Sequence, residues 1–468
     1  MTNRPFIHLF QTYGQKYVYD VNTNVILKVP DNVYQFLIEN KNDFEKLQAN
    51  PVLNIMIKDG FFDSNPIEEI IHPSDEVISY MANNSLKMLT MQVTQRCNLD
   101  CKYCTYSDDY LNRDHSQKEM DFETAKKSID FLIQHSKDTR EIHFGFYGGE
   151  PLLNFELIKE CVDYIKEVGV GKEISFGMTT NGTLLTEKVV KYLKKHNFSI
   201  LISLDGPEEI HNENRVFKKN CQGSFDIIME RLNQVQQDFP EFFARNIRFN
   251  AVIDPLLDFS CTNTFFANYE TVKDANVQFS FISNNYRKDK VDYSNEQLSL
   301  FNYEIFKLFL SRLGRLSEDK VSKLVQNYYL STKSKYHEER TAGRRLPPKV
   351  HHSGPCIPGV LRLFVNAEGE FFPCERVSEN SEVTKIGHVD SGFDMDKVKE
   401  VLNIGKLTED KCKNCWAIRF CTLCVAAADN LTSLSSDKKR SKCGEVKATI
   451  QRGLQEYCTL REFGHNFA

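Results

Sequence analysis

The chain has 468 residues, a formal net charge of −5 and a pI near 6.2, so it is long enough for roughly two to four domains. It lacks an overall basic excess and any apolar run of about 18 residues, which argues against nucleic-acid partners and against a membrane partner. Without a signal-peptide pattern at its start, we expect a cytoplasmic protein whose 14 cysteines act as metal ligands rather than disulfides.

Residues 1–80 form the first predicted unit, which has strands before helices. We expect three short β segments at 5–14, 16–24 and 25–31, helices at 32–40 and 43–50, and a closing segment at 54–62. This order resembles the winged-helix-like domain with which ribosomal-peptide modifying enzymes recognise a precursor. The resemblance implies that a leader peptide binds as an added strand on an exposed sheet edge. A DNA-binding winged helix is disfavoured because no helix is notably basic, and a purely structural cap is the remaining alternative.

Three cysteines in eight residues follow a strand expected at 88–94. Cys97, Cys101 and Cys104 form a CxxxCxxC group with no fourth Cys or His nearby. Structural zinc sites usually take four ligands, whereas three thiolates can hold a [4Fe–4S] cluster with one iron left open. The spacing, with Tyr103 before the last cysteine, resembles the radical SAM superfamily. That resemblance implies that the open iron chelates S-adenosylmethionine and that the three cysteines are catalytic, with a zinc or plain ferredoxin site as the alternative.

Residues 84–285 alternate between strands and helices, which predicts a parallel sheet with right-handed crossovers. Helices are expected at 122–135 and 155–169, and the further strands within 141–151, 173–182, 198–207, 246–254 and 277–283. Six such units predict an α/β fold, a partial (β/α)6 TIM-like barrel. Ligands of such sheets lie at the carboxyl ends of the strands.

Polar and glycine motifs stand where these strands are expected to end. Gly148 and Gly149 would let the backbone approach a ligand closely. The radical SAM resemblance implies that Glu150 lies near the methionine ammonium and that Arg215 binds the methionine carboxylate, which a guanidinium matches in a bidentate way. It also implies further contacts to the ribose and methionine parts of the cofactor. The cofactor-binding candidates are Tyr103, Gly148, Gly149, Glu150, Asn181, Ser203, Asp205 and Arg215.

Residues 286–350 are expected to form a helical bridge, with a helix over 295–316 and a linker from 341 to 355. The remaining part, residues 351–468, is expected to be a small cysteine-rich domain that binds metal. A CxxCx₅C run begins at Cys412, and Gly369 and Cys374 form a GxxxxC pattern. The series resembles the SPASM domain of radical SAM maturases, although the CxxC at 421–424 is one residue shorter than the usual spacing.

The SPASM resemblance implies two auxiliary [4Fe–4S] clusters, and therefore three clusters in the chain. The metal ligands implied for the distal one are Cys412, Cys415, Cys421 and Cys443, and those for the proximal one are Cys356, Cys374 and Cys424. Two zinc sites are the alternative.

The proximal set is one ligand short by this count. Cys458, His351 or His352 could fill the fourth position, or the iron could stay open for a substrate thiolate. Three scattered cysteines have no predicted role: Cys161, which we expect to be buried packing in a helix, Cys221 and Cys261.

Taken together, the three parts resemble maturases that install Cys sulfur-to-carbon thioether links in Cys-rich precursor peptides, the ranthipeptide type. The implied mechanism is reductive cleavage of S-adenosylmethionine, hydrogen abstraction from the peptide by the 5′-deoxyadenosyl radical, and bonding of a peptide cysteine to that carbon. The implied partners are a ribosomally made precursor with a leader and an electron donor such as flavodoxin or ferredoxin.

Three alternatives share some of these features. An anaerobic sulfatase-type maturase would oxidise Cys or Ser to formylglycine. A carbon–carbon crosslinking or epimerising peptide maturase would have every motif named here. A zinc-stabilised peptide- or DNA-binding protein could use the same cysteines without catalysis.

Overall fold

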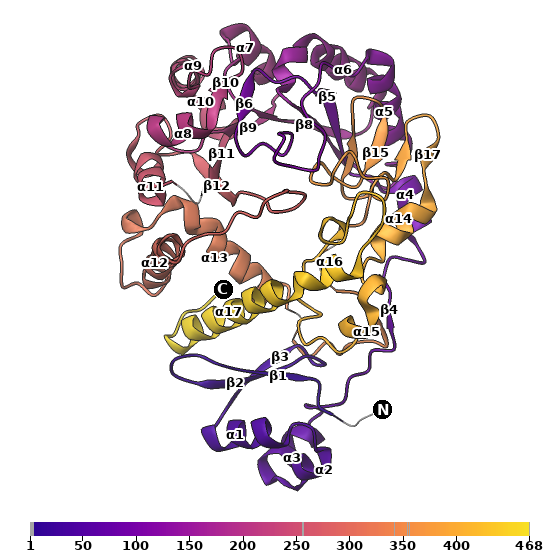
Figure 1. The fold of residues 1–468 in the computed structure, drawn as a ribbon, viewed down its shortest axis with the longest axis vertical. Helices are drawn as coiled ribbons and strands as arrows, with labels where there is room; N and C mark the ends of the chain where they lie inside the picture. The colour runs from indigo at the N-terminus through magenta and orange to yellow at the C-terminus, as the bar shows by residue number, and fades with distance from the viewer. Residues whose placement is uncertain (1–3, 255–256, 341, 353, 355, 468) are drawn as a thin grey trace.

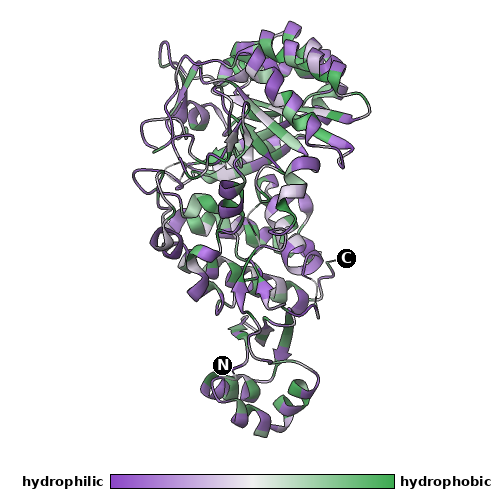
Figure 2. Cartoon of the chain, turned by 90° about the vertical axis from the view of Figure 1, so that its right-hand side faces the viewer, coloured by the Kyte–Doolittle hydropathy of each residue, from purple (hydrophilic) through white to green (hydrophobic). Residues whose placement is uncertain are grey.

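The structure is a computed structural model and describes residues 4–254, 257–340, 342–352, 354 and 356–467, so positions 341, 353 and 355 of the predicted linker lie outside the described residues. Figure 1 shows the parts stacked along the long axis, with a helix-covered sheet at the top, the C-terminal region beside and below it, and the N-terminal unit at the bottom. Figure 2 shows the same stack from the side, with hydrophobic strands inside its upper part.

Six parallel strands form the central sheet, as predicted. They lie side by side in the order β12, β11, β9, β8, β7, β5, so each new strand is added next to the preceding one. Their bounds are β5 (Met88–Thr94), β7 (Glu141–Gly148), β8 (Glu173–Thr180), β9 (Ser199–Ser203), β11 (Ile247–Ile253) and β12 (Asn276–Phe281). The predicted α/β fold with a central parallel sheet is therefore confirmed.

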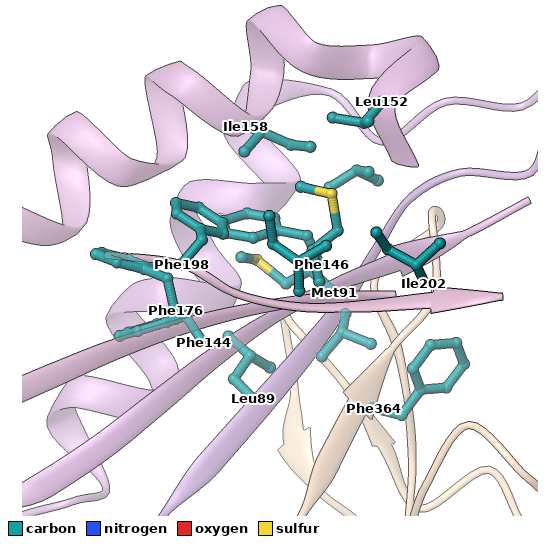
Figure 3. Close-up of a cluster of buried hydrophobic side chains, with 14 of the residues drawn as sticks. Leu89, Met91, Phe144, Phe146, Leu152, Ile158, Phe176, Phe198, Ile202 and Phe364 are labelled. Atoms are coloured by element: carbon teal, nitrogen blue, oxygen red, sulfur yellow. The ribbon is translucent and has the colours of Figure 1, made fainter. Parts of the chain in front are cut away.

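One row of apolar side chains runs across five neighbouring strands. Met91, Phe146, Met178, Ile200 and Ile247 are in register, and each is at most 4 % exposed. Figure 3 shows the first two of them among the buried side chains between the strands and a covering helix. Full burial of such a side chain contributes about 1.5–3 kcal/mol, so this row fixes the register that brings the strand ends together.

Helices between the strands cover the sheet. In α6, Ile158, Val162 and Ile165 are fully buried at helical spacing, and Figure 3 shows Ile158 above the strands. Cys161 of the same helix is also fully buried, as predicted for a packing residue. The helices of this part are α5 (Phe122–Gln134), α6 (Phe155–Val168), α7 (Glu187–Lys195), α8 (Glu208–Asn214), α9 (Phe225–Asp238), α10 (Pro240–Asn246) and α11 (Phe259–Asn268).

The C-terminal region continues the central sheet. Its strand β14 (Leu363–Val365) pairs in parallel with β5, and β15 (Glu370–Phe372), β16 (Gly387–His388) and β17 (Gly392–Phe393) extend it antiparallel. Phe364 of β14 also contributes to the buried cluster of Figure 3. The helical elements here are α14 (Met395–Leu402), η5 (Lys406–Thr408), α15 (Glu409–Cys412), η6 (Val425–Ala427), α16 (Ser436–Ser441) and α17 (Cys443–Glu462).

The N-terminal unit is a three-stranded antiparallel sheet followed by three helices. One set of its apolar side chains, including Val18 and Leu37, forms a core of its own. Another set, including Phe10 and Tyr17, packs with Tyr457 of α17. The elements are β1 (Ile7–Gln11), β2 (Lys16–Asp20), β3 (Val25–Val29), α1 (Asp31–Asn40), α2 (Phe44–Ala49) and α3 (Pro51–Lys58).

Two further segments join the parts. Strand β4 (Glu69–Ile70) pairs in parallel with β13 (Lys349–Val350), and α4 (Ile78–Asn84) leads into β5. The bridge consists of α12 (Asn295–Arg312), η2 (Glu318–Lys320), η3 (Lys323–Val325), α13 (Gln326–Lys333) and the π-helical turn η4 (Ser334–Glu338). Across the described ranges, no helix combines the length and the apolar character needed to cross a membrane.

Candidate functional site

The loop after β5 carries the first three cysteines. Cys101 ends the short strand β6 (Leu99–Cys101), and the backbone N–H of Cys104 donates to its carbonyl at 3.0 Å. All three thiols are free and half-buried. Burial, together with Glu150 and the other two cysteines, raises the pKa of Cys97. Burial also raises the pKa of Cys101 to about 12 and that of Cys104.

These thiols suit a metal cluster. A thiol with a raised pKa stays protonated in water, whereas a bound metal holds it as thiolate. The three cysteines lie within one loop of eight residues, and their thiols act on one another's pKa. The donor set therefore fits an iron–sulfur cluster with three protein ligands.

A second strand holds Arg215 against this loop. Strand β10 (Arg215–Phe217) pairs antiparallel with β6, which sets Arg215 opposite Cys101. The Nη1 atom of Arg215 lies 3.9 Å from the Cys101 sulfur, and its Nε donates to Asp205 at 2.9 Å. Tyr103 donates its hydroxyl to the same Asp205 oxygen, and the guanidinium lies 5.3 Å from the Tyr103 ring centre. Three predicted cofactor contacts, Tyr103, Asp205 and Arg215, thus form one hydrogen-bonded group beside Cys101.

Glu150 is fully buried at the end of β7. One of its carboxylate oxygens accepts from the Thr180 hydroxyl at 2.7 Å and from the Leu152 N–H at 3.1 Å, and the other accepts from the Asn181 N–H at 2.7 Å. Burial raises the pKa of Glu150 to about 7 despite these bonds. The predicted contact to a methionine ammonium therefore stays a prediction, and the carboxylate already links the ends of β7 and β8.

The two glycines before Glu150 are explained by the backbone next to them. A Cβ atom on Gly148 would lie 2.1 Å from the Thr94 carbonyl oxygen, and one on Gly149 would lie 2.1 Å from that of Arg96. The Glu150 N–H donates to the Arg96 carbonyl at 2.8 Å. The two glycines thus let the backbone after β7 approach the backbone at the start of the cysteine loop. The sequence predicted this close approach toward a bound ligand instead.

Asn181 lies in a polar network that the sequence analysis missed in part. Its amide donates to the Asn98 side chain at 2.8 Å, and Asn98 donates to the Thr183 hydroxyl at 2.9 Å. Because Asn98 follows Cys97 directly, this network ties the cysteine loop to the end of β8. Ser203 lies half-buried at the end of β9, in register with Asn250 of β11.

A buried ion pair above the loop was also missed. Arg113 lies 2.9 Å from Glu379 of the C-terminal region, and its guanidinium stacks over the Tyr106 ring at 3.9 Å. Gln92 of β5 donates to the same Glu379 oxygen at 2.7 Å. The only sequence signal was that Tyr106 and Arg113 follow the cysteine motif.

The assignment of the C-terminal cysteines to two clusters stays a prediction, and the pKa values show which of these thiols act on one another. Burial raises the pKa of Cys424, and the Cys356 thiol raises it further. Burial also raises the pKa of Cys374 to about 12, and the Cys424 thiol contributes to this increase. In the other set, burial raises the pKa of Cys421 to about 11, with Cys415 and Cys412 adding to it. Cys443 acts in the same way on Cys415.

Two of the three candidates for a fourth proximal ligand, Cys458 and His351, have other contacts. Cys458 is 3 % exposed in the apolar core shared by α17 and the N-terminal unit. His351 accepts from the Gly405 N–H at 2.8 Å, and its other ring nitrogen lies 3.1 Å from the His352 carbonyl oxygen. Among the described residues, no group of three or more His, Cys, Asp or Glu converges on a single metal ion. The cysteines of a cluster each bind a different iron.

Comparison with known proteins matches residues 91–244 to the Radical SAM superfamily. That range contains Cys97, Cys101, Cys104, Glu150, Asn181, Asp205 and Arg215.

Two curated relatives and one solved structure are similar to the chain. The radical SAM cyclopropyl synthase TigE of Paramaledivibacter caminithermalis is 28% identical over 40% of this chain and 43% of its own length. The Cys-type anaerobic sulfatase-maturating enzyme of Clostridium novyi is 32% identical over 32% of this chain and 40% of its own. The chain thus spans less than half of either relative. Native anSMEcpe with bound AdoMet superposes with a TM-score of 0.58 at 20% identity, over 79% of this chain and 98% of that one, and shares its fold.

Proposed function

We propose that this chain, whose residues 91–244 form a radical SAM domain, is a peptide maturase that installs Cys sulfur-to-carbon thioether links in a ribosomally made, Cys-rich precursor. The observation that carries the proposal is the presence in the sequence of two sets of three cysteines, whose thiols act on one another's pKa. One lies in the loop after β5, and the other is Cys356, Cys374 and Cys424 in the C-terminal region. Each group would leave one cluster position without a protein ligand.

The first site has a distinct task for each residue. When bound there, S-adenosylmethionine and a [4Fe–4S] cluster would supply radical chemistry able to remove a hydrogen atom from an unactivated carbon. Arg215, oriented by Asp205, would bind the cofactor's carboxylate, because a guanidinium forms strong charge-assisted hydrogen bonds. Tyr103 donates its hydroxyl to Asp205 and would help to hold this ion pair in place.

The second site would hold the sulfur that bonds to the peptide carbon. Cys356, Cys374 and Cys424 would bind the proximal auxiliary cluster, and its fourth position would take a peptide thiolate. The burial of Cys458 in another core supports an open position. Cys412, Cys415, Cys421 and Cys443 would bind the third cluster, through which the surplus electron leaves toward an acceptor. An external protein such as flavodoxin or ferredoxin would supply the first electron.

A peptide substrate agrees with the comparisons. AnSMEcpe, with the same fold, has also been solved with bound AdoMet and the Cp18Cys peptide. In this chain the outer strand β3 of the N-terminal unit would bind the precursor's leader as a fourth strand. The adjoining helices expose Ile38, Val52 and Ile55, which are apolar side chains of the kind that contact a leader.

Formylglycine formation is the second candidate, because a sulfatase maturase of Clostridium perfringens is 23% identical over 72% of this chain and 87% of its own length. The two functions differ in the fate of the substrate sulfur. A thioether keeps the sulfur and removes two hydrogens from the peptide, whereas conversion of Cys to formylglycine removes the sulfur.

Mass spectrometry of the product distinguishes the two. The anaerobically reconstituted chain is incubated with S-adenosylmethionine, reductant and a short Cys-rich peptide encoded beside its gene. Loss of two hydrogens per modified cysteine, with that sulfur no longer alkylated by iodoacetamide, is expected. Loss of sulfur from a sulfatase peptide, with the Cys-rich peptide unchanged, would contradict the proposal.

A further inference from the structure

A lysine is buried among the cysteines of the proposed distal cluster. Lys439 of α16 is 1 % exposed, and its Nζ donates to the Ile404 carbonyl at 2.7 Å and to the Thr408 hydroxyl at 3.1 Å. Figure 1 places α16 between the helix-covered sheet and α15, the helix that ends at Cys412. Lysine is rarely buried unless its charge is compensated, so this position needs an explanation.

The Thr408 hydroxyl connects Lys439 to a cysteine. Thr408, 2 % exposed, has its Oγ1 only 3.2 Å from the Cys412 sulfur. Because Lys439 Nζ donates to the Thr408 oxygen, the hydroxyl hydrogen of Thr408 is free to donate to the Cys412 sulfur. A thiolate has no hydrogen of its own, so the Thr408 hydroxyl is then the donor to Cys412.

The charges around Lys439 come from the same cysteine set. Both of its hydrogen-bond acceptors, the Ile404 carbonyl and the Thr408 hydroxyl, are neutral. The Cys443 sulfur lies 3.9 Å from the Lys439 carbonyl oxygen, and the Cys412 sulfur lies 3.2 Å from the Thr408 hydroxyl to which Lys439 donates. Two of the four proposed ligands thus lie beside this lysine and its partner, and thiolates around a cluster would supply the missing negative charge.

We propose that Thr408 and Lys439 are positioning residues that raise the reduction potential of the distal cluster. Thr408 does so by donating a hydrogen bond to the Cys412 sulfur. Lys439 holds the Thr408 hydroxyl in place for this bond and adds a buried positive charge. Hydrogen bonds to cluster sulfurs and nearby positive charge both stabilise the reduced state, which carries one more negative charge. This inference rests on the proposed function, because it requires a cluster at Cys412, Cys415, Cys421 and Cys443.

The consequence is directional electron flow. An acceptor cluster with a raised potential takes an electron more readily from the proximal cluster. The pair would thus help the surplus electron to leave the site where the thioether forms. Without the pair, the distal cluster would be harder to reduce, although its ligands would be unchanged.

The test is an EPR-monitored redox titration of the full-length, reconstituted chain. The signal that disappears in Cys412→Ala identifies the distal cluster. The variants are Lys439→Met and Thr408→Val, which remove the charge and the hydroxyl, and Lys439→Arg and Thr408→Ser, which keep them. Arg440→Met is the matched control, because it removes a positive charge from the same helix at an exposed ion pair with Asp410.

At a fixed solution potential, Lys439→Met and Thr408→Val should each lower the ratio of reduced to oxidised distal cluster about tenfold. This corresponds to a decrease of ~59 mV in the reduction potential of a one-electron couple. Lys439→Arg, Thr408→Ser and Arg440→Met should stay within about twofold of the wild type, which is ~18 mV on the same scale. If Lys439→Met loses iron instead, Thr408→Val decides, because its side chain is almost isosteric.

Two outcomes would overturn the inference. If Lys439→Met and Thr408→Val keep their full iron content and the potential of the wild type, the two residues have only a structural role. The proposed function would be unaffected by this result. A wild-type chain without any signal that depends on Cys412 would instead overturn the three-cluster proposal, and this inference with it.

Discussion

At the scale of single residues, the site depends on a buried charge pair beside the cysteine loop. The Arg215 and Asp205 side chains are 7% and 2% exposed, and neither is stable in such a place alone. Asp205 holds the Nε edge of the guanidinium, so the Nη side is directed toward Cys101. The ion pair therefore presents a fixed positive group next to the proposed cluster.

Replacing Arg215 tests this arrangement. Arg215→Met should weaken S-adenosylmethionine binding at least about tenfold, because a hydrogen bond to a charged group contributes about 1.5–3 kcal/mol. Isothermal titration calorimetry of the reconstituted chain with S-adenosylmethionine measures this affinity. Lys102→Met is the control from the same loop, since Lys102 forms an exposed pair with Glu213 and should change affinity by less than about twofold. Equal affinities in both variants would exclude Arg215 from cofactor binding.

Cys458 is the residue that decides whether the proximal cluster has an open position. It packs in the core of α17, so Cys458→Ala should keep about twelve irons per chain and full crosslinking activity. Iron analysis and product mass measure both. Loss of about four irons would make Cys458 a ligand, and the proximal cluster would then act only as an electron relay.

At the scale of elements, the cysteine loop is positioned by the strands on either side of its base. Strand β7 pairs with β5 along its length, and Gly148 and Gly149 then pack against the backbone of Thr94 and Arg96. A side chain at these positions would collide with main-chain atoms, which cannot move aside alone. The start of the cysteine loop is thus fixed by backbone contact.

Gly149→Ala should therefore displace the loop. Its Cβ would lie 2.1 Å from the Arg96 carbonyl oxygen, and overpacking of this kind costs about 1–3 kcal/mol. We expect loss of about four of about twelve irons and of 5′-deoxyadenosine formation. Gly444→Ala, where a Cβ meets no atom within 4 Å, should leave both unchanged. Full iron content in Gly149→Ala would show that the loop tolerates the shift.

The sequence predicted the six parallel strands because strand–helix alternation is a local signal. It also placed Asp205 near an expected strand end, and it assigned Arg215 to the same site through the radical SAM resemblance. It did not predict that Arg215 lies opposite Cys101, because the β6–β10 pairing joins segments more than 110 residues apart in the chain. The Arg113–Glu379 and Thr408–Lys439 contacts were missed for the same reason: long-range packing of polar residues leaves no periodic pattern in the chain.

At the scale of the whole molecule, the N-terminal unit is docked rather than simply tethered. Tyr17 donates to Glu462 of α17 at 2.8 Å, and His8 stacks on Trp416 with ring centres 3.5 Å apart. Asn65 donates to the Lys413 carbonyl of the C-terminal region at 2.6 Å, and β4 pairs with β13 just before that region. A truncation that removes the unit should therefore end before Asn65.

Deletion of residues 1–63 tests the leader proposal. The truncated chain should still cleave S-adenosylmethionine reductively, because the cysteine loop and Arg215 are unchanged. Its turnover of the full precursor should fall at least about tenfold, the loss expected when an added-strand contact is removed. The wild-type chain with a leaderless precursor is the control and should be equally slow. Equal turnover with and without the leader would make the unit a structural cap.

The most direct test of the account concerns Cys97, Cys101 and Cys104. When all three are replaced by alanine, the reconstituted chain should keep about eight of about twelve irons, because the C-terminal cysteines are separate. Chromatography of the reaction with dithionite and S-adenosylmethionine should then detect 5′-deoxyadenosine from the wild type and none from the variant. Equal 5′-deoxyadenosine formation by the two would contradict the account.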